Sequence, residues 1–160
     1  MAPTRSLLLA CALLALVARP ATADATIFLG ANVTPSNRLV KGLAVEVGFL
    51  VVGFEFEYAQ TSDDILAKAP ALKTGMGNLL LQTPFPVLGL QPYITAGVGL
   101  YQETLGAHDD TGLGLNTGGG VKIGLVGPLR LRLDYRVFSL GSGALASPAH
   151  RFYTGLNLSF

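Results

Sequence analysis

Residues that could do chemistry are most concentrated between Pro128 and Phe138, where charged and apolar side chains alternate. The charged positions are Arg130, Arg132, Asp134 and Arg136, and the positions between them are Leu129, Leu131, Leu133, Tyr135 and Val137. A period of two over about ten residues predicts a β-strand, because a helix would spread the arginines around its circumference. Guanidinium groups and carboxylates form strong, often bidentate, ion pairs. The charged face therefore needs either bulk water or a polar interior with partners for its charges.

Two other groups of residues resemble chemical motifs without the pattern that the chemistry requires. The run from Gly118 to Lys122 (GGGVK) lacks the spacing and the Ser/Thr ending of a phosphate-binding loop, so its glycines are interpreted as packing positions in a strand. His108, Asp109 and Asp110 could bind a divalent cation, but a single loop does not supply three well-placed ligands, and a solvated loop is favoured. We therefore expect no metal, no cofactor and no catalytic residues.

Residues 1–23 have the features of a cleaved secretory signal peptide. Arg5 supplies the positive start, Ser6 to Val17 form an apolar core, and Ala21-Thr22-Ala23 is a small-x-small cleavage site before Asp24. The apolar run is too short for a spanning helix and ends at Arg19-Pro20. This predicts a signal peptide at 1–23 and a single domain at 24–160.

Cys11 lies inside this leader, in a segment (Leu8-Leu9-Ala10-Cys11) that loosely resembles a lipoprotein processing box. Cleavage there would leave an unusually short apolar core, so we interpret Cys11 as part of the discarded leader. The mature chain would then contain no cysteine, which excludes disulfides, thiolate nucleophiles and cysteine metal sites.

The composition of the mature chain excludes further classes. It would carry 9 Lys and Arg against 10 Asp and Glu, so no basic patch indicates nucleic acid and no acidic tract indicates disorder. No apolar run after the leader reaches the length of a spanning helix. If the chain enters a membrane, it does so as a barrel, because only helices and closed sheets satisfy their backbone in lipid.

Eight strand-like segments follow from the alternation of apolar and polar residues. They cover about 25–34, 42–50, 53–60, 74–83, 91–103, 112–125, 129–138 and 150–160. The predicted connections between segments one and two, three and four, five and six (Thr104 to Thr111), and seven and eight are long. Those near Leu50–Val52 and Val126–Pro128 are short, and the Pro84-Phe85-Pro86 connection is intermediate. This alternation is typical of a barrel whose long loops lie on one side of a membrane.

The final segment places Phe152, Leu156, Leu158 and Phe160 on one face and ends on an aromatic residue. This ending resembles the C-terminal signal that the barrel-assembly machinery reads in bacterial outer-membrane proteins. Together with the eight alternating segments, the chain resembles the small OmpA/OmpX-like outer-membrane β-barrel family. The resemblance implies an all-β fold, an eight-stranded antiparallel up-and-down transmembrane β-barrel, and residence in the bacterial outer membrane.

Alternation alone does not distinguish this barrel from a soluble, lipocalin-like one with an apolar lumen. The terminal aromatic strand, the low charge content (13% Asp, Glu, Lys and Arg) and the arginines decide for an apolar outer face. An Arg or Lys on a lipid-facing wall costs roughly 2–4 kcal/mol at mid-membrane, so the arginines are expected to point inward. We predict a cross-lumen ion-pair network formed by Glu46, Glu55, Glu57, Lys122, Arg130, Arg132, Asp134 and Arg136.

The expected function follows from this architecture and from the resemblance. We expect a structural or surface-interaction role, as a monomer in outer-membrane lipid, with an unidentified extracellular ligand at the loops and no nucleic acid. A narrow pore for small solutes is the second hypothesis. A lipid A-modifying enzyme is the third, although neither His108 nor His150 lies in the His-x-Ser arrangement that the resemblance would require.

Overall fold

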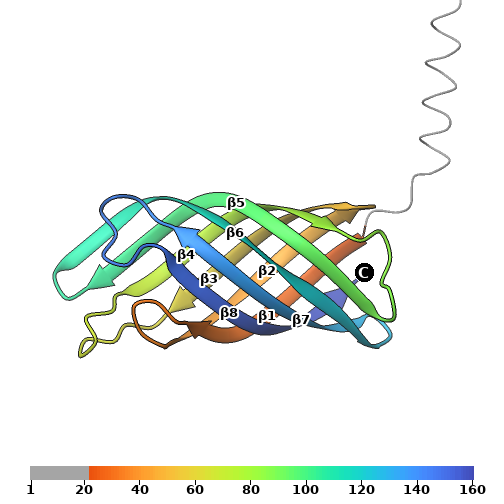
Figure 1. The fold of residues 1–160 in the computed structure, drawn as a ribbon, viewed down its shortest axis with the longest axis horizontal. Coiled ribbons are helices and arrows are strands. Elements are labelled where there is room, and N and C mark those ends of the chain that lie inside the picture. Colours follow the sequence, from red (N-terminus) through yellow and green to blue (C-terminus); the bar gives the residue numbers. More distant parts are fainter. Residues whose placement is uncertain (1–21) are drawn as a thin grey trace, which may run out of the picture.

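The computed structural model describes residues 22–160, which form eight antiparallel strands in one closed barrel (Figure 1). The strands are β1 (Thr22–Asn32), β2 (Arg38–Phe49), β3 (Val52–Thr61), β4 (Ala71–Gln82), β5 (Leu90–Leu105), β6 (His108–Val126), β7 (Leu129–Ser139) and β8 (Ala149–Ser159). Each strand pairs with its neighbours in sequence order, and β1 also pairs with β8. The predicted eight-stranded antiparallel up-and-down barrel is confirmed.

The signal peptide predicted at residues 1–23 lies outside the described residues, apart from Thr22 and Ala23, which begin β1. The cleavage site therefore stays a prediction. Among residues 22–160, no helix has the length and apolar character needed to cross a membrane.

The barrel closes along the seam between the first and last strands. The pairing runs from Asp24 opposite Ser159 to Asn32 opposite Arg151. Beyond it, the amide of Phe160 donates to the carbonyl of Ala23 at 2.8 Å. Closure removes the unpaired edges that an open sheet would present for aggregation.

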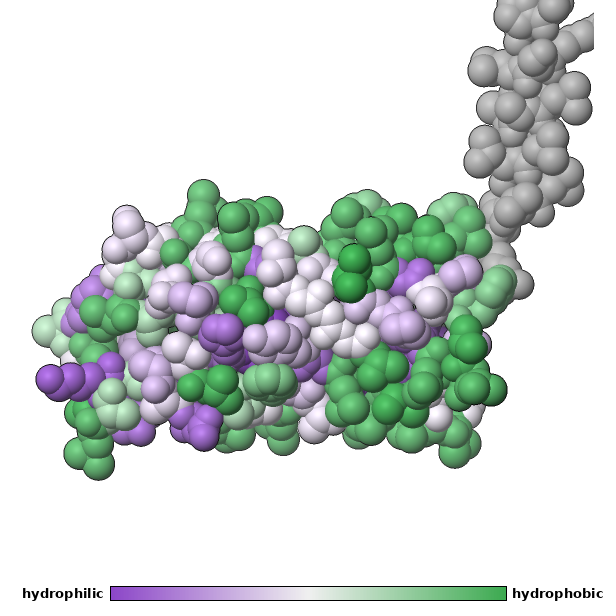
Figure 2. Space-filling model, in the orientation of Figure 1, coloured by the Kyte–Doolittle hydropathy of each residue, from purple (hydrophilic) through white to green (hydrophobic). Residues whose placement is uncertain are grey.

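Side chains alternate between the lumen and the outer wall, as the period of two predicts. On β7, Arg132, Asp134 and Arg136 are buried inside the barrel, whereas Leu133 and Tyr135 are exposed outside. On the last strand and the residue after it, the outward apolar side chains are Phe152, Leu156, Leu158 and Phe160, with Thr154 between them. Figure 2 shows the result, with apolar residues covering much of the wall around the right half of the barrel.

The two ends of the barrel differ in their connections. The end that we call the loop side carries connections 33–37, 62–70, 106–107 and 140–148, and it lies on the left in Figure 1. The other end, the turn side, carries connections 50–51, 83–89 and 127–128 together with Thr22 and Phe160. The predicted short turns near Leu50 and Gly127 are confirmed. The connection between β1 and β2, which was predicted to be long, has only five residues and is shorter than the connection 83–89.

The long loop predicted from Thr104 to Thr111 is wrong. Strands β5 and β6 remain paired up to Leu105 opposite His108, so a two-residue turn joins them. Gly106 adopts a φ of +60°, a conformation that glycine reaches without strain. Polar contacts also join the two strands below the turn, where Tyr101 donates to Asp110 Oδ2 at 2.6 Å. These contacts extend the ladder through residues whose polarity resembled that of a loop.

The interior is filled by side chains and contains apolar clusters beside its charges. Leu72, Met76, Tyr101, Phe138 and Ala149 form one cluster, and Phe28, Val40, Ala59 and Tyr153 form another. An aromatic residue at the end of a strand, such as Phe138, could belong to an aromatic belt at the membrane interface, but its side chain is fully buried inside the barrel. Phe138 follows the arginines by an even number of residues and therefore shares their face.

Candidate functional site

The most organised group of polar side chains is a set of three arginines and three carboxylates at the centre of the lumen, which we call the arginine layer. It comprises Arg132, Arg136, Arg151, Glu55, Glu57 and Asp134. Arg132 Nη1 lies 2.5 Å from Glu55 Oε2, and Arg132 Nη2 lies 3.0 Å from Asp134 Oδ2. One guanidinium thus bridges β3 and its own strand β7. A planar fork with several donors is suited to joining two carboxylates in this way.

Arg136 and Arg151 continue the layer toward the loop side. Arg136 contacts all three carboxylates, with Nη2 2.8 Å from Glu55, Nη1 3.2 Å from Glu57 and Nε 3.0 Å from Asp134. Arg151 Nη1 lies 3.0 Å from Glu57 Oε1, and its Nη2 donates to Thr74 Oγ1 at 3.2 Å. The side chains of all three arginines have no exposed surface. Every charge in the layer is therefore balanced by another side chain rather than by bulk water.

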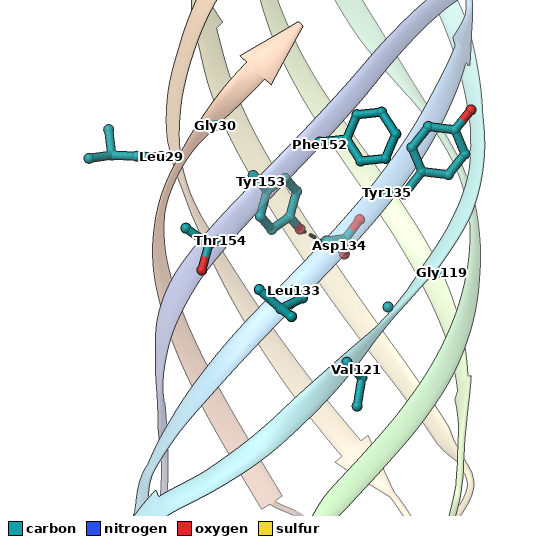
Figure 3. A pocket seen from close by; sticks show the side chains of 11 residues that line it. Leu29, Gly30, Gly119, Val121, Leu133, Asp134, Tyr135, Phe152, Tyr153 and Thr154 are labelled. Carbon is teal, nitrogen blue, oxygen red and sulfur yellow. Dashed lines mark hydrogen bonds between the residues drawn. The ribbon is translucent and has the colours of Figure 1, made fainter. Parts of the chain in front are cut away.

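Two tyrosines complete the hydrogen bonds of Asp134. Tyr93 from β5 and Tyr153 from β8 both donate to Asp134 Oδ2, the latter at 2.9 Å. Figure 3 shows the ring of Tyr153 turned toward Asp134, while Leu133 and Val121 point away from the lumen. Arg132 Nε in turn donates to the hydroxyl of Tyr93 at 2.7 Å. A buried carboxylate that accepts from two arginines and two hydroxyls is well solvated by the protein itself.

A second polar group lies toward the turn side, and we call it the lysine layer. Lys122 Nζ lies 2.7 Å from Asp24 Oδ2 and 2.8 Å from Glu46 Oε2. Arg130 reaches the same aspartate only at 3.9 Å, donates to Gln91 at 3.1 Å, and keeps 24% of its side chain exposed. A polar cavity of about 190 Å³ opens beside these residues, bounded by the segment Pro84–Pro86. The lysine layer is therefore a buried ammonium group between two carboxylates, beside a polar cavity at the turn side.

The loop side of the lumen is covered by apolar side chains and by the connection 140–148. The ring of Phe138 lies 4.2 Å from the Arg151 guanidinium, so it covers the end of the arginine layer. Glu103 is buried at this end of the lumen and accepts a hydrogen bond from the backbone amide of Leu145 at 2.5 Å. Arg38 is also buried at this end, and it donates to the carbonyl of Thr34 at 2.8 Å.

Charges in the lumen nearly balance. Within residues 22–160, six cations and six carboxylates line it: Arg38, Lys122, Arg130, Arg132, Arg136 and Arg151, with Asp24, Glu46, Glu55, Glu57, Glu103 and Asp134. A seventh carboxylate, Asp110, is half-buried near the tip of the β5–β6 hairpin and faces the same side as Tyr101. No group of three or more metal-ligating side chains suited to a metal ion occurs in this part of the chain. Most of these cations and carboxylates therefore neutralise each other at close range inside the barrel.

All eight residues predicted for the lumen point inward, and the structure places them in two adjacent layers, because Glu46 is directly opposite Glu55 and Lys122 is directly opposite Arg132. Glu55, Glu57, Arg132, Asp134 and Arg136 lie in the arginine layer, whereas Glu46 and Lys122 lie in the lysine layer with Arg130 at its rim.

Sequence reasoning did not name Asp24, Arg151, Tyr93 or Tyr153 as members of the network. The signal for Arg151 was available, because it alternates with the outward residues Phe152, Leu156 and Leu158 and so belongs to the inward face. Asp24 follows the predicted cleavage site directly, and its partner Lys122 is 98 residues away, so no local pattern joins them.

On the outer wall, the aromatic residues of β7 and β8 form a small cluster around the C-terminal strand. The Tyr135 and Phe152 rings lie 4.4 Å apart, and Tyr135 Oη lies 2.8 Å from His150 Nδ1. Beside this cluster, an apolar groove of about 640 Å³ is lined by residues that include Leu29, Gly119, Leu133 and Thr154 (Figure 3).

Comparison with known proteins supports the fold independently. No protein-family model matches the sequence, and no curated protein matches it. The solved structure of the N-terminal β-barrel domain of Pseudomonas aeruginosa OprF superposes with a TM-score of 0.66 at 13% identity, covering 87% of this chain and 97% of that one. Neisserial surface protein A gives a TM-score of 0.65 at 17% identity, covering 88% and 96%.

A third solved structure, the outer membrane enzyme PagL, superposes with a TM-score of 0.52 at 12% identity, covering 84% of this chain and 98% of that one. At such low identities the likeness concerns the fold alone. The chain therefore has the architecture of the small outer-membrane barrels, and its function has to be argued from its own residues.

Proposed function

We propose that this chain is an integral β-barrel protein of a bacterial outer membrane, with its outer wall in contact with acyl chains. The observation that carries the proposal is the inverted distribution of polarity: charged side chains fill the lumen, whereas residues such as Ile27 (66% exposed), Phe54 (67%) and Ile94 (63%) cover the outside. A soluble monomer rarely exposes large contiguous apolar surfaces. Lipid would remove this surface from water and leave every backbone group paired within the closed sheet.

A soluble binding barrel is disfavoured by the same distribution. A lipocalin-like protein holds its ligand in an apolar lumen and presents polar side chains to water. In this chain the lumen holds fully buried arginines, and moving apolar ligands into it would separate charges that already have partners. Solubility after refolding without detergent would overturn the membrane assignment.

We propose a structural and surface-interaction role rather than transport for the barrel. The arginine layer and its three unexposed arginines occupy the cross-section, so ions would have to displace a charge-paired network. The loop side, with connections 33–37, 62–70 and 140–148, is available for contact with an extracellular ligand whose identity is open.

A narrow pore is the second candidate, because the turn-side cavity beside Lys122 is a polar opening into the lumen. The two functions differ in conductance. In planar bilayers we expect the folded protein to produce no discrete current steps. Reproducible steps that disappear when the protein is omitted would favour the pore.

We propose no catalytic role. Within residues 22–160, neither His108 nor His150 pairs with a carboxylate or hydrogen-bonds to a serine, and His150 Nδ1 contacts Tyr135 instead. A His–Ser–acid arrangement on the lipid-facing wall is one way to activate a nucleophile for acyl-ester hydrolysis. Mass spectrometry of lipid A from cells with and without the protein tests this proposal, and loss or gain of an acyl chain would contradict it.

The test of the central proposal is membrane fractionation combined with electrophoresis of unheated and heated samples. We expect the protein in the outer-membrane fraction as a monomer whose migration changes on heating. Phe152, Leu156, Leu158 and Phe160 would serve as the signal for the barrel-assembly machinery, and the leader would be absent from the mature protein. Recovery in the soluble fraction, with no change of migration on heating, would contradict the proposal.

A further inference from the structure

Charged residues are almost absent from the outer wall of the barrel, and the exceptions are informative. Among residues 22–160, six of the nine Lys and Arg residues line the lumen, and the other three are Lys41, Lys68 and Lys73. Lys68 lies in the connection 62–70. Lys41 on β2 and Lys73 on β4 are exposed on the wall itself, where the remaining charged residue of the described strands is Asp109, near the tip of the β5–β6 hairpin.

The two wall lysines are neighbours across one strand. Lys41 is directly opposite Gln60 of β3, and Gln60 is directly opposite Lys73 of β4. Because paired strands lie about 4.8 Å apart, the two lysine backbones are separated by about 10 Å. Their four-carbon stems are flexible, so both ammonium groups can approach one ligand from opposite sides of Gln60.

Nothing in the described part of the chain neutralises these lysines. Neither Lys41 nor Lys73 lies within ion-pair distance of a carboxylate, in contrast with Lys122 inside the barrel, which contacts two. Between the lysines, Gln60 Nε2 donates to Tyr58 Oη at 2.6 Å. The Tyr58 hydroxyl accepts this bond, so its own hydrogen remains available to a ligand outside the wall.

The position of the two lysines along the barrel axis indicates which kind of ligand they meet. Both lie near the loop-side ends of their strands, three residues after Arg38 and two residues after Ala71. Toward the turn side, the same strands and β3 present outward apolar residues such as Leu43, Phe56 and Leu79. A lysine is strongly unfavourable in the middle of the bilayer but costs little near its surface. The pair therefore marks the level at which lipid headgroups lie.

We propose that Lys41, Lys73 and Tyr58 bind the phosphate group of an anionic lipid in the leaflet next to the loop side. The proposal rests on the membrane insertion proposed above. Two ammonium groups and a hydroxyl donor around a neutral Gln60 supply positive charge and directed hydrogen bonds, which suit a phosphate. The acyl chains of the same lipid would lie along the apolar wall below, on Leu43, Phe56 and Leu79.

Selective lipid binding in nanodiscs tests the proposal. The folded protein is reconstituted in phosphatidylcholine containing a minority of bis-phosphorylated lipid A, and co-purifying lipid is counted by native mass spectrometry. A basic residue near a charged membrane surface contributes about 1 kcal/mol, so the double variant K41Q/K73Q should lose about thirtyfold in lipid A selectivity. Each single variant should lose about fivefold, and Y58F less.

Lys68→Gln is the matched control, because it removes one lysine from the loop-side connection and leaves the wall unchanged. We expect it to retain the lipid A selectivity of the unmodified protein within about twofold, since Lys68 lies in the connection 62–70 and not on the wall beside Gln60. Replacing lipid A by its dephosphorylated form should abolish the selectivity of the unmodified protein.

The outcomes separate this inference from the proposed function. Each variant is first required to show heat-modifiable migration, so that loss of binding is not loss of folding. A protein that fails to enter nanodiscs at all would contradict membrane insertion. A protein that inserts, but whose K41Q/K73Q variant keeps its lipid A selectivity, would overturn the lipid site alone. Equal losses for K68Q and the wall variants would overturn it too, because they would indicate general charge attraction.

Discussion

The two charged layers of the lumen both neutralise buried charges, but they do so with different residues. In the arginine layer, Arg132 and Arg136 each contact two or more carboxylates, and no part of either side chain is exposed. In the lysine layer, a single ammonium group lies between Asp24 and Glu46, next to the turn-side cavity. The guanidinium groups of Arg132, Arg136 and Arg151 are in the layer that lies farther from this cavity.

This difference follows from how the two cations bind. A guanidinium is planar, weakly hydrated and able to donate along several fixed directions, so it can satisfy carboxylates on two strands without water. An ammonium group is a compact and strongly hydrated charge, which is better accommodated where water is near. The comparison indicates that a charged group farther from the turn-side cavity depends more on protein side chains for its neutralisation.

The largest effect is expected from Arg132→Ala, because it leaves Glu55 and Asp134 buried with one partner fewer. Removing one member of a buried ion pair typically costs about 3–5 kcal/mol. We expect the free energy of unfolding, measured by urea titration in lipid vesicles, to fall by about this amount. An unchanged urea midpoint would show that the arginine layer does not stabilise the barrel.

A smaller effect is expected from Lys122→Met, which removes the central cation of the lysine layer. Water from the turn-side cavity can partly hydrate Asp24 and Glu46, so the loss should resemble that of charged hydrogen bonds, about 1.5–3 kcal/mol. The same urea titration measures it. A loss as large as that for Arg132→Ala would remove the distinction between the layers.

Coupling between residues sharpens the comparison further. In a double-mutant cycle, Arg132→Ala and Glu55→Ala should be non-additive by on the order of 1–3 kcal/mol, because the two side chains touch. The control cycle pairs Arg132→Ala with Glu103→Ala, whose contact is with the Leu145 amide at the loop side. That cycle should be additive within about 0.5 kcal/mol, because the two side chains share no partner. Equal coupling in both cycles would mean that the coupling does not come from the contact between Arg132 and Glu55.

The smallest effect is expected from Arg130→Gln at the rim of the lysine layer. Its nearest carboxylate is 3.9 Å away and its side chain is partly exposed, so the ion pair should contribute about 0–1 kcal/mol. The urea midpoint should move little. A loss comparable to that for Lys122→Met would indicate that Arg130 is a full member of the layer.

Local alternation predicted the eight strands, and the cost of placing an arginine in lipid decided which face of β7 points inward. The period of two placed Arg132, Asp134 and Arg136 inside and Phe152 outside, because a strand turns successive side chains to opposite faces. The length of the β5–β6 hairpin was not predictable from composition, since the polar residues from Gln102 to Thr111 pair with one another across the strands.

The division of the interior into two layers also lay beyond local patterns. Lys122 meets Asp24 because β6 and β1 face each other across the closed barrel, and Tyr153 meets Glu57 for a similar reason. Such contacts depend on strand register and barrel closure, which the alternation of a single strand does not contain. The same reason explains why Tyr93 and Tyr153 were not recognised as partners of Asp134.

The seam between β1 and β8 has a consequence for the order of folding. Tyr153 lies 96 residues from Glu57, and Arg151 lies 94 residues from the same carboxylate. The β7–β8 hairpin carries all three arginines of the layer but only one of its carboxylates, Asp134, whereas Glu55 and Glu57 are on β3. Full neutralisation of the arginines therefore waits until the barrel closes. In a partly assembled barrel the arginines would still be hydrated. Removing this water before their carboxylate partners arrive would cost free energy, because the charges would be left unpaired. Closure and dehydration of the interior are thus expected to be one late, cooperative event, and contacts of such long range make it slow.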